Sequence, residues 1–313
     1  MSLKKFIIND IPYKWTVTKD HPTKWLNGQD ELTINFVRYN LIINFLKKFF
    51  LGRDKLKILD IGIYPGITPK ILNKYFPKKE NISKFYGLGI GFHEEFKYEM
   101  KKINVDLLEA DLDPRISTKK ISKKIEIKDE EMDLVIFTDV IEHFYDPFYA
   151  LKEINRVMKK NAKMILTTDN ISRYYSLISI LKGNSNNTPI LSSNIFYNGD
   201  WRPHFREYSK NELFNLFKWS GFKVLEHKYY EAEFGMYFKD KNSLIKKDFR
   251  KFSFKGKVSD LIRRCLIKVN PKFRDNQICI VEKIQNISEI EKNIPKLTEN
   301  IDEWHLQRKN FQD

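Results

Sequence analysis

Short apolar runs alternate along this chain with segments whose apolar residues recur every three or four positions. Residues 132–140, "MDLVIFTDV", are almost continuously apolar, which is typical of a strand buried on both faces of a sheet. Residues 147–160, "PFYALKEINRVMKK", show the spacing of an amphipathic helix. Seven strands are predicted in this way, at residues 55–62, 84–91, 103–113, 132–140, 162–170, 222–230 and 276–284.

The helical segments lie between these strands. They cover residues 31–50, 68–76, 93–102, 147–160 and 209–221, the last with Ser209 as N-cap and Gly221 just past its end. Alternating strands and helices predict a doubly wound, mostly parallel sheet with helices on both faces.

The organisation along the chain follows from the same pattern. We expect an N-terminal helical cap segment over residues 1–50, one domain over 51–284 and a polar tail over 285–313. Two insertions interrupt the alternation, a lid at 171–207 and a basic stretch at 233–275.

Composition and charge narrow the class of protein. The 313 residues are 42% hydrophobic, enough to build a sizeable core. The net charge of +15 favours an anionic partner, although a lysine-rich composition from an A/T-biased genome explains it equally well. Cys265 and Cys279 form no CxxC pair, so we expect no zinc site and no disulfide framework. Without a signal peptide or an apolar membrane span in the sequence, we expect a cytoplasmic protein.

Ligands of doubly wound sheets bind at the carboxyl ends of the strands, so the residues there are the first site candidates. They are Asp60, Gly62, Gly66, Gly89, Asp111, Asp139, His143 and Asn170. The first turn, "KILDIGIYPG", has the spacing G-x-x-x-G and so is not the dinucleotide fingerprint G-x-G-x-x-G. Several carboxylates together suit a ligand with an amine, hydroxyls and a positive centre rather than a polyphosphate.

Taken together, three stretches resemble the class I S-adenosylmethionine-dependent methyltransferases. They are "LDIGIYPG", "DLVIFTDVIEHFYDPFYALKEINRVMKKNAKMILTTDN" and "HFREYSKNELFNLFKWSGFKVLE". The resemblance implies a Rossmann-like fold, S-adenosylmethionine as cofactor and an enzyme of the broad branch that methylates sugars, quinones and other metabolites.

The resemblance also implies cofactor contacts. Asp60 would order the first loop or meet the methionine amine, Gly62 and Gly66 would let the backbone approach the methionine part, and Asp111 would face adenine. Asp139 would lie at the methyl-donating end. Two departures stand out: Tyr64 replaces a loop glycine and would line the pocket, and Gly89 stands where the family has the acid that binds ribose. Glu94 or Glu95 could reach back in its place.

Methyl transfer needs an aligned acceptor and, for many oxygen or nitrogen acceptors, a base. His143 and His204 are the catalytic candidates, and each has a structural alternative, helix capping for His143 and lid anchoring for His204. Asp139, Glu142 and His143 would permit a metal, but the pattern is not diagnostic and we predict none.

We predict that the acceptor is a small molecule or glycan, modified most readily at oxygen and plausibly anionic. Four residues are predicted to bind it, Tyr197, Trp201, Arg206 and Asn170. Residues 240–275 mix Lys and Arg with Phe, Leu and Ile, and so could touch a membrane surface, grip nucleic acid or pack on the sheet. Of the three, nucleic acid is the least favoured. The alternative functions are a catalytically impaired cofactor-binding subunit and an RNA methyltransferase.

Overall fold

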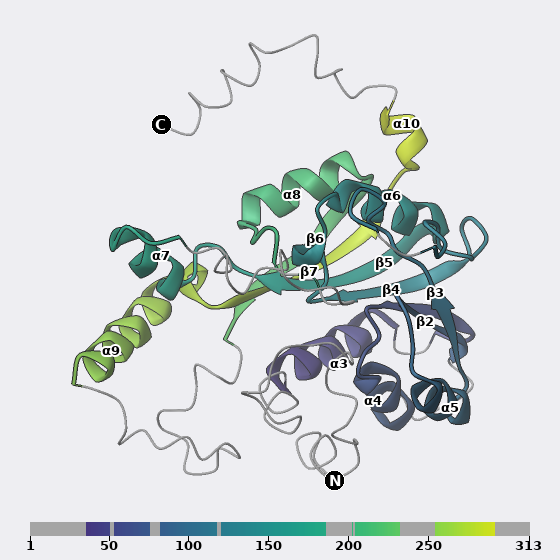
Figure 1. Ribbon diagram of the computed structural model, residues 1–313, viewed down its shortest axis with the longest axis horizontal. Coiled ribbons are helices and arrows are strands. Elements are labelled where there is room, and N and C mark those ends of the chain that lie inside the picture. The colour runs from purple at the N-terminus through teal and green to yellow at the C-terminus, as the bar shows by residue number, and fades with distance from the viewer. Residues whose placement is uncertain are drawn as a thin grey trace.

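A seven-stranded sheet organises the chain (Figure 1). The computed structural model describes residues 36–50, 53–75, 82–117, 120–185, 202, 204–231 and 254–291. The strands are β1 (Leu56–Ile61), β2 (Ile82–Gly89), β3 (Val105–Glu109), β4 (Met132–Thr138), β5 (Met158–Asp169), β6 (Phe222–Tyr230) and β7 (Asn276–Lys283). Their order is β3-β2-β1-β4-β5-β7-β6, with β7 antiparallel to both of its neighbours and the other pairs parallel. The predicted mostly parallel, doubly wound sheet is therefore confirmed.

Helices cover both faces of this sheet. α3 (Phe36–Phe50), α4 (Ile67–Tyr75) and α5 (Glu94–Lys102) cover one face, and α6 (Pro147–Val157) and α8 (Lys210–Trp219) cover the other (Figure 1). Each face has its own apolar core, because alternate residues of a strand point to opposite sides. Seven residues of α3 are buried, so this part of the predicted N-terminal cap segment belongs to the core of the sheet.

The helix ends show where sequence signals hold and where they fail. α8 begins with a capping box between Ser209 and Glu212, and Gly221 follows its end with a φ of +81°, as predicted. The prediction that α6 runs to residue 160 is wrong, because it ends at Val157. Met158 pairs with Met132 instead and starts β5, so strand pairing overrides the helical spacing there.

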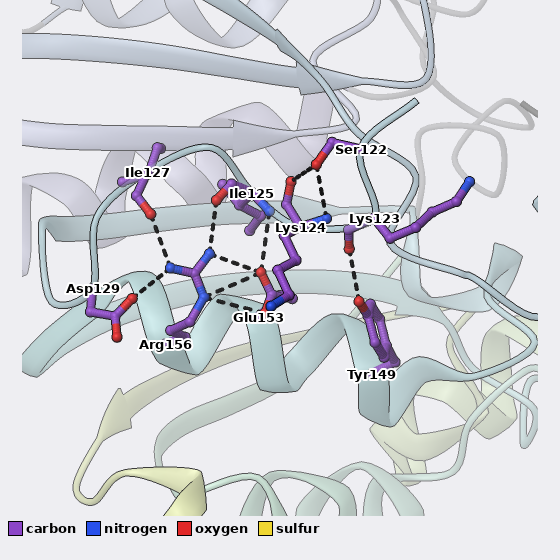
Figure 2. A network of polar contacts seen from close by, with 9 residues as sticks. All are labelled: Ser122, Lys123, Lys124, Ile125, Ile127, Asp129, Tyr149, Glu153 and Arg156. Carbon is purple, nitrogen blue, oxygen red and sulfur yellow. Dashed lines mark hydrogen bonds and ion pairs between the residues drawn. The ribbon is translucent and has the colours of Figure 1, made fainter. Parts of the chain in front are cut away.

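The connection between β3 and β4 is fastened to α6 by a polar network (Figure 2). The guanidinium of Arg156 donates to the carbonyl oxygens of Ile125 and Ile127, and to the carboxylates of Asp129 and Glu153. One turn earlier on α6, the hydroxyl of Tyr149 donates to the carbonyl of Lys123 at 3.0 Å. These bonds fix a long connection whose start forms one wall of the site described below.

The remaining elements lie at the edges. They are the short helices η3 (Ile141–His143) and η7 (Pro271–Phe273), and the helices α7 (Tyr174–Leu181), α9 (Phe254–Val269) and α10 (Ile287–Glu291). α7 and α9 lie side by side, joined by a 3.0 Å contact between the Tyr174 hydroxyl and Ser259 Oγ (Figure 1). In the part of the chain that the structure describes, none of the helices is both long and apolar enough to cross a membrane.

Candidate active site

A cavity of about 670 Å³ opens where β1, β2, β3 and β4 end. Among its walls are six residues predicted from the sequence: Gly62, Tyr64, Gly89, Asp111, Asp139 and His143. Its volume lies within the roughly 300–1,000 Å³ that is usual for small-molecule sites. The parallel strands bring these side chains together because their carboxyl ends share one edge of the sheet.

The turn after β1 forms the floor of the cavity. Gly62 has a φ of +76°, and a Cβ there would lie 2.4 Å from a methyl carbon of Val140. Glycine is therefore required by the turn and by close packing. Tyr64 lines the cavity as predicted, with its ring stacked at 4.3 Å on that of Phe96 and its hydroxyl accepting the N–H of His93 at 3.1 Å.

Two predicted cofactor contacts in this region do not face the cavity. Gly66 packs against α5, since a Cβ there would lie 2.7 Å from Cε of Met100. Asp60 is fully buried beneath the turn, where it forms a hydrogen bond with Thr68. Burial raises the pKa of Asp60 to about 7, partly offset by that hydrogen bond and by the charge of Arg38. Asp60 therefore orders the loop rather than touching a ligand.

Asp139 is held from below by the first helix. Its backbone is in the left-handed region, with a φ of 51°, which places its carboxylate between two donors. Arg38 of α3 forms an ion pair with one oxygen, and the hydroxyl of Thr167 donates to the other at 2.5 Å. Asp139 thus lines the cavity with its carboxylate already bound by the fold.

A carboxylate lies beside Gly89, where the family resemblance leads one to expect an acid. Gly89 pairs in register with Glu109 at the end of β3, and both residues line the cavity. Lys97 lines it too, with its ammonium 3.6 Å from the Glu109 carboxylate and 3.0 Å from that of Glu94. Glu94 points to solvent and is not part of the wall, so Glu109 is the better placed of the two acids.

Asp111 and Arg202 close the next part of the wall. The Arg202 guanidinium donates to the Asp111 carboxylate at 2.6 Å, and the N–H of Asp113 donates to the other oxygen at 3.1 Å. Burial opposes the charge of Asp111, but the hydrogen bond and charge of Arg202 outweigh it and hold the pKa of Asp111 below its ordinary value. Arg202 thus ties the segment before α8 across the cavity to the end of β3.

The two predicted catalytic histidines meet at the opposite end. The Nδ1 atom of His143 lies 2.5 Å from the carbonyl oxygen of Arg202. A carbonyl oxygen can only accept, so Nδ1 carries the proton and Nε2 carries the lone pair of the neutral ring. The rings of His143 and His204 stand edge to face at 4.6 Å, but only His143 lines the cavity.

Behind His143 lies a cluster of buried charges. His204 Nδ1 is 3.2 Å from the Asp169 carboxylate, and Arg173 bonds both Asp169 and Glu207. Burial favours the neutral ring, but the Asp169 hydrogen bond and the nearby acids raise the pKa of His204 to about 9. Burial raises the pKa of Glu142 to about 7, whereas His204 and Arg173 outweigh burial at Asp169 and lower its pKa to about 2.

The same cluster has the geometry of a metal site. Two overlapping triples of described residues bring possible ligand atoms within 4.8 Å of one another: Glu142, His143 and His204, and Asp169, His204 and Glu207. Arg173 and the protonated His204 already supply positive charge to these carboxylates. A metal ion would have to compete with both cations.

The residues predicted to bind the acceptor are dispersed. Asn170 is buried outside the cavity wall, and its amide nitrogen donates to the carbonyls of Lys272 and Arg274, so it anchors η7. Arg206 is exposed and pairs with Glu212 on α8, away from the cavity. Tyr197 and Trp201 lie outside the described residues.

The site and the fold together define a doubly wound enzyme domain with a cofactor cavity. Its donor set fits S-adenosylmethionine, because Glu109 and Asp111 can accept from hydroxyl and amine groups while Leu88, Ile90 and Leu112 offer apolar walls to a base. Residues 35–227, more than half of the chain, match the model of the methyltransferase domain family. The chain belongs to this family, and it is an S-adenosylmethionine-dependent methyltransferase, as its motifs predicted.

Solved structures show the same fold at low sequence identity. A chain from the complex of the Haloferax volcanii methyltransferase activator Trm112 with its partner is 13% identical, with a TM-score of 0.50, over 80% of this chain and 92% of that one. A SAM-dependent methyltransferase from Archaeoglobus fulgidus is 17% identical, with a TM-score of 0.45, over 78% and 94%. The Haemonchus contortus phosphoethanolamine N-methyltransferase 2, solved with phosphomonomethylethanolamine and S-adenosylhomocysteine, is 16% identical, with a TM-score of 0.48, over 79% and 53%. No curated protein sequence matches the chain.

Three cavity or support residues were missed by the sequence reasoning. Arg38 gave no signal, because it lies on a helix far from the strand ends. Arg202 was considered only as an anion clamp or a surface ion pair, yet it is largely buried against Asp111. Glu109 did carry a signal, since it ends a predicted strand next to the one that ends in Gly89.

Proposed function

We propose that this enzyme methylates an oxygen atom of a small-molecule or glycan acceptor, with His143 as the general base. The observation that carries this proposal is the position of His143 in the cavity wall, with Nδ1 fixed on the carbonyl of Arg202. That bond leaves Nε2 as the proton-accepting atom.

When bound, S-adenosylmethionine supplies an electrophilic methyl group on its sulfonium sulfur and leaves as S-adenosylhomocysteine. The chain's part is to position the acceptor in line and to receive its proton on Nε2 of His143 as the new O–C bond forms. The Asp169–His204 pair behind His143 places a positive charge against its ring edge, so it favours the neutral ring that the base requires.

Three carboxylates line the cofactor cavity: Glu109, Asp111 and Asp139. We assign Glu109 to the ribose hydroxyls, Asp111 with Leu112 to the adenine edge, and the turn of Gly62 and Tyr64 to the methionine part. The Glu109 carboxylate supplies an acid where Gly89 has none, which argues against a subunit that has lost its cofactor function.

The test uses S-adenosylmethionine labelled with tritium in its methyl group, offered with sugars, sugar acids, phenols and, separately, bulk RNA. We expect label in a small hydroxylated acceptor and none in RNA. Label confined to RNA, or transfer to an acceptor that carries no removable proton, would overturn the assignment.

A further inference from the structure

α9 is amphipathic in the reverse sense to an ordinary surface helix, because its charged residues face inward. Arg263 is only 1% exposed, and its guanidinium bonds the carboxylates of Glu231 and, at 3.2 Å, Asp260. Asp260 and Glu231 are also buried. The helix is therefore fastened to the domain through an ion-pair network rather than an apolar face.

The outward face of α9 is apolar. It carries Val258, Leu261, Ile262, Leu266 and Val269, which are between 37% and 84% exposed. Their spacing of three or four residues puts them on one side of the helix, and the exposed Cys265 lies among them. A contiguous aliphatic stripe of this kind marks an interaction site on a soluble protein.

α7 enlarges this apolar region. It exposes Tyr175, Ile180 and Leu181, the last by 81%. It lies against α9 through the Tyr174–Ser259 contact and through Tyr175, whose ring centre is 5.9 Å from the Arg263 guanidinium carbon. We call the exposed apolar residues of both helices the α7–α9 surface; the pair projects from one end of the sheet (Figure 1).

The charges around this surface have one sign. Residues 254–274 contain seven Lys and Arg and a single acid, the buried Asp260, while residues 174–185 contain Lys182 and no acid. A second copy of the chain would bring like charges together. The stripe is also aliphatic, whereas the dominant contacts of protein interfaces are enriched in Trp, Tyr and Arg and poor in Leu and Val.

We propose that the α7–α9 surface docks on an anionic lipid bilayer. Leu261, Ile262 and their neighbours would enter the boundary between headgroups and acyl chains, and basic residues such as Lys268 would contact lipid phosphates. Arg173, just before α7, bonds Asp169 at 3.1 Å, so the docking surface is linked to the charge cluster behind His143. This inference does not depend on which acceptor the enzyme uses.

The experiment is co-sedimentation of the full chain with vesicles of phosphatidylcholine alone or mixed with phosphatidylglycerol. The test variants are the double substitution Leu261→Ser with Ile262→Ser, and Lys268→Glu. The matched control is Ile284→Ser, which changes an exposed isoleucine that follows β7. Circular dichroism and S-adenosylhomocysteine binding verify that each variant is folded.

We expect the wild type and Ile284→Ser to bind the anionic vesicles at least tenfold more tightly than the neutral ones. The double variant should bind about tenfold more weakly and Lys268→Glu about fivefold more weakly, with folding and cofactor binding unchanged. Equal binding by the wild type and the double variant, or no vesicle binding by the wild type, would overturn the proposal. So would a wild-type dimer in sedimentation velocity that the double variant abolishes, because a second copy would then cover the surface.

Discussion

Glu109→Gln tests whether Glu109 replaces the missing ribose acid. The substitution keeps the shape of the side chain and one acceptor oxygen, but it removes the charge. A hydrogen bond to a charged group contributes roughly 1.5–3 kcal/mol. Glu109 is 40% exposed, so water competes for it and the low end of that range applies. We expect a loss of about 1.4 kcal/mol, which is about tenfold in the Kd for S-adenosylhomocysteine.

The assay is isothermal titration calorimetry with S-adenosylhomocysteine and with its analogue that lacks the ribose 2′-hydroxyl. Glu94→Gln is the matched control, because its carboxylate contacts the same Lys97 but lies outside the cavity wall. We expect Glu109→Gln to weaken the natural ligand much more than the deoxy analogue, and Glu94→Gln to change neither. If Glu109→Gln binds both ligands like the wild type, or weakens both equally, the ribose assignment is refuted.

Three further predictions concern the base, the first helix and the charge cluster. His143→Gln should lower kcat by about 100-fold, within the range for loss of a general base, while calorimetry shows unchanged S-adenosylhomocysteine affinity; retained turnover would exclude His143 as the base. Arg38→Ala leaves Asp139 without its cation, so urea unfolding should show a loss of about 2 kcal/mol, less than for a fully buried pair because Asp139 stays partly exposed. In contrast, Lys48→Ala, in an exposed ion pair, should cost under about 0.5 kcal/mol, and equal losses would contradict the argument. The pKa of His204 rises from 6.5 to about 9 on folding, so its contribution to stability is fully present below pH 6.5 and is lost as the pH rises through 9; His204→Asn should therefore destabilise the protein below pH 6.5 and have little effect well above 9, and a pH-independent loss would refute the assigned charge.

The architecture was predictable because the strand signals are local. A run such as "MDLVIFT" has to be buried on both faces whatever surrounds it, so all seven strands were located from periodicity alone. The end of α6 was not predictable, since "MKK" continues the helical spacing and only the pairing of Met158 with Met132 makes it a strand.

The site was predictable where position alone decides and not where side-chain direction decides. Gly62, Asp111 and His143 follow strand ends and do line the cavity. Asn170 also follows a strand end, but its amide turns to η7. Arg38 reaches Asp139 from a helix far away in sequence, and no local pattern records such a contact.

The reverse amphipathicity of α9 shows the same limit. Its sequence has the spacing of an ordinary amphipathic helix, which would be expected to pack its apolar side inward. The position of Glu231 beside Arg263 reverses that orientation, and it becomes visible only in the folded chain.

The most direct test of the central claim is a crystal structure of the chain with S-adenosylhomocysteine. The account predicts the ligand in the cavity at the ends of β1 to β4, with its ribose hydroxyls within hydrogen-bond distance of Glu109. Adenine should lie beside Asp111 and Leu112, and the sulfur should face the side of the cavity that His143 lines. A ligand bound elsewhere, or one turned so that adenine contacts His143, would contradict the account.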